Sequence, residues 1–324
     1  MVKRIGIVGL GSIGLQHKHA ISRIAPGVDI VVIRSREVSP LELRSKSSDV
    51  TYSLSDGIRE GLDGAIVSSP ATAHLSQARE LLEAGIGLLI EKPLSNDLNE
   101  ARKFSDFAEK QNAVCLLGYI FRYSAAAKAF KGRLNKDSLG KILHIQAECG
   151  SYLPEWRSNT DYRATVSARS ELGGGVLLEL SHEIDYLNWF FGPFSRVIGC
   201  ISHSGTLEVN TEDSVDVIIR TIDGLSINLH LDFNRRHKSR RCVVQTETGE
   251  LSWSVNDGVV SWRPAHGIVE KENFDSNKER LLDNQITHFL NCLVGHDTPV
   301  ANLRHGLEVL TIVDAIRESD KRRK

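Results

Sequence analysis

A six-residue glycine motif near the N-terminus constrains the fold of this chain more than any other feature. Its residues are Gly9, Leu10, Gly11, Ser12, Ile13 and Gly14. The motif directly follows the apolar run Ile5–Val8 and opens an amphipathic segment, Ile13–Ile24. In this context Gly9 allows a tight turn, Gly11 lets the backbone approach a pyrophosphate, and Gly14 permits close packing of helix on strand. The motif therefore predicts dinucleotide binding, with an ordinary glycine-rich turn as the simpler alternative.

Short apolar runs alternate with helical patterns through the first third of the chain. The expected strands are Ile5–Val8, Ile30–Ile33, Ala65–Val67, Leu88–Ile90 and Val114–Leu117. The expected helices between them are Ile13–Ile24, Ala73–Ala84 and Leu98–Gln111. Alternation of this kind is typical of a parallel sheet with helices on both faces. It predicts a Rossmann domain with a doubly wound parallel sheet over residues 1–120.

The pattern changes after Gly118, where strands begin to follow one another without intervening helices. The expected strands are Ile142–Glu148, Val215–Ile222, Ser226–Phe233, Arg241–Thr246 and Leu251–Val255. The expected helices are Ser124–Leu134, Val176–Phe191, Asn277–Val294 and Leu303–Glu318. Alternating apolar and polar residues, with Asp223-Gly224 as a hairpin turn, indicate antiparallel strands with one covered face. Residues 121–324 are therefore predicted to form an α+β domain with a largely antiparallel, open-faced sheet, in a chain of α/β class.

Composition narrows the classes of function. The 40 Lys and Arg residues against 41 Asp and Glu give a formal charge of −1, so no nucleic-acid partner is expected. The five cysteines are odd in number and contain no CxxC pair, which predicts neither a metal site nor a disulfide framework. No apolar run approaches a membrane span, and the N-terminal one is too short for a signal peptide. These features favour a soluble, cytoplasmic protein.

The residues after the second expected strand bear on the choice of dinucleotide. NAD sites place Asp or Glu about 20 residues beyond the glycines, to accept hydrogen bonds from the ribose hydroxyls. This chain instead has Arg34, Ser35 and Arg36 there. Two guanidinium groups and a hydroxyl suit a 2′-phosphate, which favours NADP with NAD as the alternative. Both arginines could also be solvated loop charges.

Three further segments complete a recognisable combination: Ser68–His74, the triplet Glu91-Lys92-Pro93, and Gly173–Asp185. Together with the glycine motif, they resemble the glucose–fructose oxidoreductase, inositol dehydrogenase and rhizopine catabolism (Gfo/Idh/MocA) family. The resemblance implies a Rossmann domain followed by an α/β domain whose open sheet often makes oligomer contacts, and a cis peptide before Pro93. It adds a second group of cofactor-binding residues: Ser69, Pro70, His74, Glu91, Lys92 and Pro93.

The same resemblance makes Lys92 and His182 the catalytic residues. An ammonium group at the carboxyl end of a parallel strand can hydrogen-bond a reacting oxygen and stabilise its negative charge. Three glycines leave the backbone free to approach a ligand at a helix start, and Glu179, His182 and Asp185 follow at three-residue spacing, close to one face of the expected helix. A histidine there can take a hydroxyl proton, with a carboxylate orienting it. Family members often carry Asp four residues before this histidine, where the chain has Leu178. Either Glu179 takes the acidic role, or the role is absent.

An aromatic and arginine-rich segment follows the strand Ile142–Glu148. Aromatic faces stack on sugar rings or bases, and arginines bind phosphate or carboxylate. The segment resembles a branch of the family found with nucleotide-sugar and surface-polysaccharide pathways, but it could also pack at a subunit interface. The candidate substrate-binding residues are Lys92, Arg122, Tyr152, Trp156, Arg157, Tyr162, Arg163, Glu179 and His182.

The leading hypothesis is an NAD(P)-dependent dehydrogenase that oxidises a secondary alcohol of a sugar or nucleotide sugar. Two alternatives stay open: a non-catalytic sensor of the NADP redox state, and an enzyme with a tightly held cofactor that eliminates or cleaves a glycoside without net redox. An open sheet face needs a partner, so a homodimer or homotetramer is expected.

Overall fold

The computed structural model describes residues 1–34, 48–157 and 160–322. The chain divides into two compact units, of which the first comprises Met1–Ile120 and Lys278–Leu307 and the second Phe121–Asn277 and Glu308–Lys324. The prediction placed all of 121–324 in one domain, whereas Lys278–Leu307 joins the first unit. The reason is packing, because the apolar side of this C-terminal segment is buried against the first unit's helix α1.

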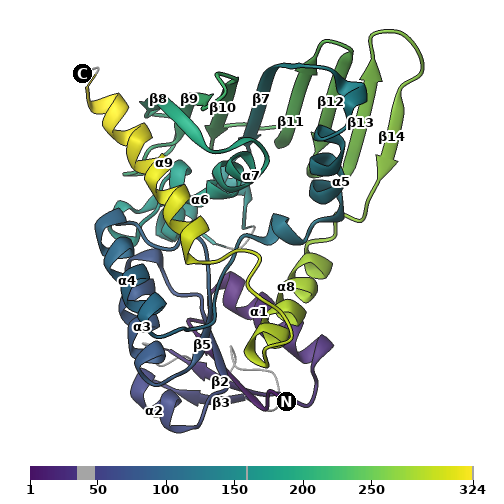
Figure 1. Ribbon diagram of the computed structural model, residues 1–324. Helices are drawn as coiled ribbons and strands as arrows, with labels where there is room; N and C mark the ends of the chain where they lie inside the picture. The colour runs from purple at the N-terminus through teal and green to yellow at the C-terminus, as the bar shows by residue number, and fades with distance from the viewer. Residues whose placement is uncertain (35–47, 158–159, 323–324) are drawn as a thin grey trace. The chain divides into compact units, whose positions relative to one another are not determined.

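The first unit contains one parallel sheet. Its strands are β1 (Arg4–Val8), β2 (Asp29–Ile33), β3 (Ser48–Thr51), β4 (Gly64–Val67), β5 (Gly87–Ile90) and β6 (Cys115–Leu117), and its helices are α1 (Ser12–Ile24), α2 (Leu54–Arg59), α3 (Ala71–Glu83), α4 (Leu98–Lys110) and α8 (Lys278–Leu293). The strand order is β3-β2-β1-β4-β5-β6, with every pair parallel. Helices α3 and α4 lie along one side of the sheet, and α1 and α8 along the other (Figure 1). The predicted Rossmann fold is confirmed.

The carboxyl ends of β1 and β4 mark the point where the strand order reverses. The chain leaves β1 toward β2 on one side, and the sheet continues from β4 to β5 and β6 on the other. In open α/β sheets, ligands bind in the crevice outside the carboxyl ends of the strands at such a point. The glycine motif after β1 and the segment after β4 therefore meet where a dinucleotide is expected.

The second unit is built on an eight-stranded sheet of order β14-β13-β12-β11-β7-β10-β9-β8. Its strands are β7 (Ile142–Gly150), β8 (Phe194–Ser202), β9 (Ser214–Thr221), β10 (Ser226–Asp232), β11 (Ser239–Thr246), β12 (Gly249–Ser254), β13 (Val259–Pro264) and β14 (Glu270–Asn273), and its helices are α5 (Ala125–Leu134), α6 (Val176–Glu179), α7 (Ser181–Phe191) and α9 (Leu303–Lys321), the last of which begins in the first unit. All neighbours are antiparallel except β7 and β10.

One face of this sheet is covered and the other is open. Side chains alternate between buried and exposed along β9, where Val215, Val217 and Ile219 point inward and Asp216, Ile218 and Arg220 outward. Helices α5, α7 and α9 lie over the covered face (Figure 1). Trp253, Tyr186 and Phe130 are among the largest fully buried side chains of this unit, and the Trp253 ring contacts the other two. The predicted open-faced, largely antiparallel sheet is confirmed.

One expected helix is not continuous. The prediction runs one helix from Val176 to Phe191, but α6 and α7 are separated at Leu180, whose φ of −100° and ψ of 29° are not helical. The start of α6 is held by Glu212, whose carbonyl accepts a hydrogen bond from the Val176 N–H. Helix α7 is held by two ion pairs, Arg122–Asp185 and Arg240–Glu183. Long-range contacts of this kind override local helix propensity.

Candidate functional site

The three glycines of the motif differ in what restricts them. Gly9 has φ of +88°, and a Cβ there would lie 2.9 Å from the Ser69 nitrogen. A Cβ on Gly14 would lie 2.2 Å from the Gly9 carbonyl oxygen. A Cβ on Gly11 would meet nothing within 4 Å, and Gly11 is exposed. The fold itself thus requires Gly9 and Gly14, whereas Gly11 leaves open space beside its backbone that a ligand can approach.

The N-terminus of α1 offers unsatisfied donors at the same place. Gly11 is the N-cap residue, and no side chain of the described residues caps the helix there. Ser12 and Ile13 begin the helix, and its first turn carries no acidic residue. The first backbone N–H groups of a helix lack partners within it and favour an anion. A pyrophosphate fits this cradle.

The predicted 2′-phosphate residues are only partly described. Arg34 directly follows β2, is half-buried, and its backbone N–H donates to the Thr51 carbonyl. Ser35 and Arg36 lie outside the described residues. The choice of NADP over NAD therefore stays a prediction.

The segment after β4 is fastened to the glycine motif and to the segment after β5. The Ser68 hydroxyl donates to the Gly9 carbonyl at 2.7 Å, and Ser69 donates to the Gln77 side chain at 2.6 Å. Pro70 is the N-cap residue of α3. His74 is buried, with Nδ1 at 2.9 Å from the Pro93 carbonyl and Nε2 at 2.8 Å from the Ser69 carbonyl. His74 thereby ties the ends of β4 and β5 together, and burial lowers its pKa.

The triplet Glu91-Lys92-Pro93 follows β5, and its peptide bond Lys92–Pro93 is cis, as the family resemblance implied. The Glu91 carboxylate is buried and accepts a hydrogen bond from His17 Nε2 at 2.6 Å. Its other oxygen accepts the Lys92 backbone N–H at 3.2 Å. Burial by itself would raise the pKa of Glu91, but the His17 hydrogen bond and the neighbouring positive charges hold it below its usual value. The backbone of Lys92 is thus fixed by an ionised carboxylate, while its side chain is half-buried.

His17 is a residue that the sequence prediction missed. It lies in α1, three positions after Gly14, on the buried face of that helix. Its partner is 74 positions away in the chain. A histidine on the apolar face of a helix that opens with a glycine motif was the only available signal, and it did not indicate the partner.

His182 lies in the second unit, at the start of α7. Its ring contacts Phe121, with centroids 5.1 Å apart. The next residue, Glu183, is fully buried and pairs with Arg240, whose Nε lies 2.8 Å from the carboxylate. The Arg240 guanidinium in turn lies over the Phe121 ring at 5.0 Å. His182 is therefore backed by an aromatic ring and a buried ion pair.

The acid before His182 has a defined partner. Glu179 is half-buried and accepts a hydrogen bond from the Ser167 hydroxyl at 3.0 Å, whereas Leu178 is buried in the core. The break at Leu180 means that the three-residue spacing from Glu179 to His182 does not continue along one helix face. The expected alignment of Glu179, His182 and Asp185 on one helix is wrong for this reason, and the role of Glu179 stays a prediction.

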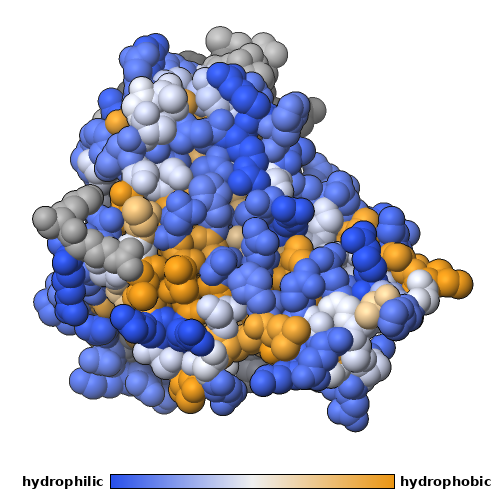
Figure 2. Space-filling model, turned by 90° about the horizontal axis from the view of Figure 1, so that it is seen from above, coloured by the Kyte–Doolittle hydropathy of each residue, from blue (hydrophilic) through white to orange (hydrophobic). Residues whose placement is uncertain are grey.

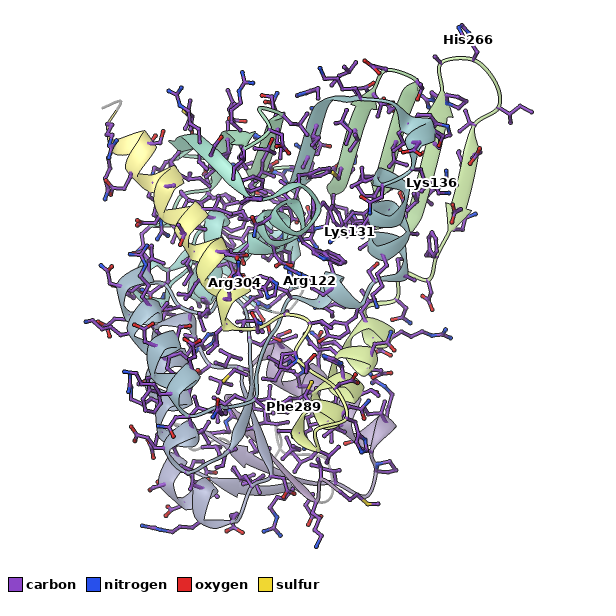
Figure 3. All side chains as sticks on the ribbon, viewed as in Figure 1. Arg122, Lys131, Lys136, His266, Phe289 and Arg304 are labelled. Carbon is purple, nitrogen blue, oxygen red and sulfur yellow. The ribbon has the colours of Figure 1, made fainter. Side chains whose placement is uncertain are left out.

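Arg122 is committed to an ion pair. It is 5% exposed, and its Nε and Nη2 donate to the two oxygens of Asp185 at 3.1 and 2.8 Å. Burial raises the pKa of Asp185, and the Arg122 hydrogen bonds oppose that rise. Arg122 and Lys131, both labelled in Figure 3, lie over the Trp189 ring. The pair anchors α7 to the turn Ile120–Tyr123, and the substrate contact expected of Arg122 stays a prediction.

The aromatic segment after β7 contains both fixed and exposed groups. Tyr152 is covered by the Arg236 guanidinium at 3.5 Å, and the Trp156 Nε1–H donates to Ser151 at 2.7 Å. Arg163 pairs with Asp161 and Glu208. The remaining two candidates are Arg157, which is exposed, and Tyr162, whose hydroxyl accepts the Glu208 N–H. Each unit thus gathers one group of predicted residues: the glycine motif, His74 and Lys92 in the first, and His182, Glu179 and this segment in the second.

The described residues include neither a metal-binding cluster nor a membrane-spanning helix. No group of three or more His, Cys, Asp or Glu side chains there is arranged to hold a metal ion. No helix in the described part of the chain has the length and apolar character that crossing a membrane requires.

Comparison with known proteins places these features in context. A family model described as "Oxidoreductase family, NAD-binding Rossmann fold" (GFO_IDH_MocA) matches residues 3–119. The corresponding C-terminal domain model matches residues 128–252. The matched residues include the glycine motif, the triplet after β5 and His182.

Curated relatives are distant. The chain is 26% identical to the rhizopine catabolism protein MocA of Rhizobium meliloti over 58% of this chain and 57% of that protein. It is 25% identical to 1,5-anhydro-D-fructose reductase of Ensifer adhaerens over 76% and 74%. It is 23% identical to inositol 2-dehydrogenase 2 of Paenarthrobacter aurescens over 98% and 95%. The alignments span about half the length of the first two curated relatives.

Solved structures share the fold across the whole chain. The WlbA dehydrogenase of Bordetella pertussis, solved with NADH and UDP-GlcNAcA, matches with a TM-score of 0.84 at 20% identity, covering 100% of this chain and 98% of that one. A levoglucosan dehydrogenase, solved with NADH and levoglucosan, matches with a TM-score of 0.87 at 18% identity, covering 99% and 97%.

Proposed function

Since this chain belongs to the Gfo/Idh/MocA family of oxidoreductases, we propose that it catalyses the reversible oxidation of a secondary alcohol on a sugar-like ring with a nicotinamide cofactor. The observation that carries the proposal is the fixed position of Lys92. Lys92 follows a parallel strand of the Rossmann sheet. The buried Glu91 carboxylate accepts the Lys92 backbone N–H, and His74 holds the carbonyl of the next residue, Pro93. Relatives and structural neighbours that act on sugars or inositols support the substrate class.

The cofactor-binding residues fit a dinucleotide. Gly9, Gly11 and Gly14, with Ser12 and Ile13, would hold the pyrophosphate at the N-terminus of α1. Arg34 would contact a 2′-phosphate, so NADP is the proposed cofactor, although the WlbA and levoglucosan dehydrogenases were both solved with NADH. A nicotinamide held by these residues would supply the hydride acceptor for oxidation and the hydride donor for reduction.

Protein residues then handle the proton and the developing charge. The Lys92 ammonium donates a hydrogen bond to the reacting oxygen and stabilises negative charge on it. His182 accepts the hydroxyl proton during oxidation and returns it during reduction. Glu179, held by Ser167, orients the substrate or the histidine. Phe121, which lies under the Arg240 guanidinium, packs against the His182 ring and restricts its rotation.

Replacing Lys92 by Met tests the proposal. The thioether preserves the length of the side chain but removes the charge and the donors, so turnover should fall at least about a hundredfold with little change in cofactor affinity. Reduction of NAD⁺ and NADP⁺ would be followed by absorbance against a panel of sugars and nucleotide sugars, and cofactor affinity by calorimetry.

Lys110→Met serves as the matched control, because Lys110 is an exposed lysine at the end of α4 in the same unit. Its turnover should equal that of the unmodified protein. Normal turnover of Lys92→Met would contradict the assigned role. Turnover that leaves no net reduced cofactor in solution would favour the alternative with a tightly held cofactor.

The open sheet face supports a homo-oligomer as part of this proposal. Its outward side chains include charges of both signs beside the half-exposed Ile218, and a shallow groove there is lined by Gln146, Asp216, Asn228 and His230. The space-filling view shows apolar patches set among hydrophilic side chains (Figure 2). A homodimer would bury this face in a two-fold interface, to which both subunits contribute the same patch.

A further inference from the structure

Seven consecutive residues of the second unit form a strongly basic run in a chain whose net charge is −1. Six of the seven residues 235–241 are basic, namely Arg235, Arg236, His237, Lys238, Arg240 and Arg241. The run spans the loop after β10 and the first residues of β11. Because like charges repel one another, carboxylates or a bound anion that offset such a run lower its electrostatic free energy.

Carboxylates of the sheet offset the residues at both ends of the run. Arg235 pairs with Glu148 at 2.9 Å and with Asp232 at 3.1 Å. Arg241 pairs with Glu148 at 2.9 Å, and Arg240 pairs with the buried Glu183. These contacts fix the stem of the loop to β7, β10 and α7.

The middle of the run, residues 236–238, is exposed to solvent and is not fixed to the sheet by buried carboxylates of the described residues. Arg236, His237 and Lys238 are all exposed. Arg236 lies over the Tyr152 ring at 3.5 Å, and its distance to the Glu155 carboxylate is 3.8 Å, with both side chains about two-thirds exposed. Exposed ion pairs of this kind contribute little. We call residues 236–238 the basic tip; its positive charge is in excess and is held on a rigid stem.

The basic tip lies beside the aromatic segment. Strands β7 and β10 are parallel, with Gly150 opposite Asp232, so the chain leaves both at the same edge of the sheet. The Leu153 N–H donates to the Phe233 carbonyl at 2.9 Å, and the Trp156 and Phe233 rings meet edge to face. Tyr152 and the basic tip therefore form one surface of arginine, lysine and aromatic groups.

The stem of this loop also reaches the neighbours of His182. Arg240, two residues beyond the basic tip, pairs with Glu183 and lies over Phe121, the ring that contacts His182. The basic tip and His182 are thus attached to the same part of the second unit.

We propose that the basic tip, with Tyr152, binds a phosphoryl group carried by the substrate, which makes the substrate a sugar phosphate or a nucleoside diphosphate sugar. The substrate role rests on the proposed function, whereas binding of the phosphoryl group does not. Two or three cationic side chains match the charge of a phosphoryl group better than they match the single charge of a carboxylate. A guanidinium group can also donate two parallel hydrogen bonds to phosphate oxygens. The Tyr152 ring adds a face for a sugar or a base.

Binding of phosphoryl compounds to the protein saturated with NADP⁺ tests the proposal, because the saturated dinucleotide site cannot take up the probe. The probes are UDP, glucose 6-phosphate, inorganic pyrophosphate and unphosphorylated glucose, titrated by calorimetry at low and high salt. We expect UDP or glucose 6-phosphate to bind and glucose not to, with affinity falling as salt rises. If UDP binds and glucose 6-phosphate does not, the substrate is a nucleoside diphosphate sugar. If glucose 6-phosphate binds as tightly as UDP, the substrate is a sugar phosphate.

The double variant Arg236→Gln/Lys238→Gln locates the site. It should weaken binding of the phosphoryl probe at least about tenfold, since two charge-assisted contacts are lost. The control Arg263→Gln/Lys271→Gln removes two exposed charges from β13 and β14 of the same unit and should bind the probe normally.

Failure of every phosphoryl probe to bind at millimolar concentration would overturn the proposal, as would equal binding by the double variant. These measurements involve no hydride transfer. A phosphoryl site without any turnover would therefore contradict the proposed function alone, and turnover of unphosphorylated sugars with no phosphoryl site would contradict this inference alone.

Discussion

Gly11 and Gly14 belong to one motif but are required for different reasons. A methyl group on Gly14 would collide with the Gly9 carbonyl, whereas one on Gly11 would meet only open space. Gly11 also has φ of −73° and ψ of −169°, which any residue can adopt. We therefore expect Gly11→Ala to keep the free energy of unfolding within about 1 kcal/mol while weakening NADP⁺ binding at least about tenfold.

Gly14→Ala is the comparison. Overpacking against backbone costs about 1–3 kcal/mol, so its thermal unfolding midpoint should fall clearly below that of Gly11→Ala. Thermal unfolding without cofactor and calorimetric titration with cofactor measure the two effects separately. Equal loss of stability in both variants would show that Gly11 is a packing residue and would remove the structural support for a ligand at that position.

His230 on the open sheet face gives a pH-dependent stability. Its Nε2 lies 3.2 Å from Asp232 and its Nδ1 2.7 Å from Asp216. The hydrogen bond to Asp232 raises its pKa most, burial opposes the rise, and Asp216 adds to it, which gives a pKa of about 8 against an ordinary 6.5. A raised histidine pKa stabilises the fold fully below about pH 6.5 and loses that contribution as the pH rises through about 8.

The comparison of His230→Gln with the unmodified protein measures this effect. The difference in unfolding midpoint between them should be largest near pH 6 and shrink by pH 9. The direction follows from the charge, because only the protonated imidazole is attracted by both carboxylates. A difference that is independent of pH would mean that the two aspartates do not act on His230 through its charge.

At the scale of elements, α7 depends on two buried ion pairs rather than on its own sequence. Asp185 pairs with Arg122 and Glu183 with Arg240, and both acids are fully or almost fully buried. The partners come from the turn before α5 and from β11. Helix α7 is therefore placed by residues 57 to 63 positions away, which no local pattern could reveal.

Removing one partner of the Arg122–Asp185 pair should lower the free energy of unfolding substantially. Arg122→Met leaves the Asp185 carboxylate buried without its cation, and losses of about 3–5 kcal/mol are typical of such a change. The urea midpoint of unfolding at pH 8 is the measurement. The loss should be smaller at pH 5, because burial already raises the pKa of Asp185 and protonation then removes the unpaired charge. Arg122→Met combined with Asp185→Leu should recover part of the stability, and no recovery would show that the pair is not the cause.

The strands that the sequence pattern missed are mostly at sheet edges. β3 is one of the two edges of the first sheet, and β8 and β14 are the two edges of the second. Edge strands are partly solvated, so they lack the apolar run or strict alternation of central strands, as the exposed residues of β14 show. The central strands β1, β4, β5, β9 and β10 were predicted close to their observed bounds because burial on one or both faces imposes a pattern.

At the scale of the molecule, the first unit is discontinuous in sequence. Helix α8 packs on α1, and the Leu293 side chain occupies the space that Gly64 and Gly87 leave open, where a Cβ would lie 2.5 Å from it. Asp283 of the same helix pairs with Arg23 at 2.7 Å. A cofactor-binding unit ending at residue 120 would expose these surfaces.

We therefore expect residues 1–120 alone to unfold at a lower temperature than the same residues joined to 278–307 by a flexible Gly/Ser linker. Burial of the apolar side of α8 provides the difference, at roughly 25 cal/mol per Å² of apolar surface. Thermal unfolding of the two fragments, followed by circular dichroism, is the measurement. Equal midpoints would show that α8 does not contribute to the stability of the first unit.

The sequence by itself determined the alternation of strands and helices, the glycine motif and the positions of Lys92 and His182 in the chain. The alternation and the motif depend on periodicity and on backbone conformation, which are local properties, whereas the roles of Lys92 and His182 came from the family resemblance and stay predictions. Tertiary structure alone decided that His17 holds Glu91, that Arg122 is committed to Asp185, that the helix breaks at Leu180, and that Lys278–Leu307 returns to the first unit. The physical reason is that a buried charge or an apolar helix face needs a partner, but many distant residues can supply it, and packing of the whole chain selects which one does.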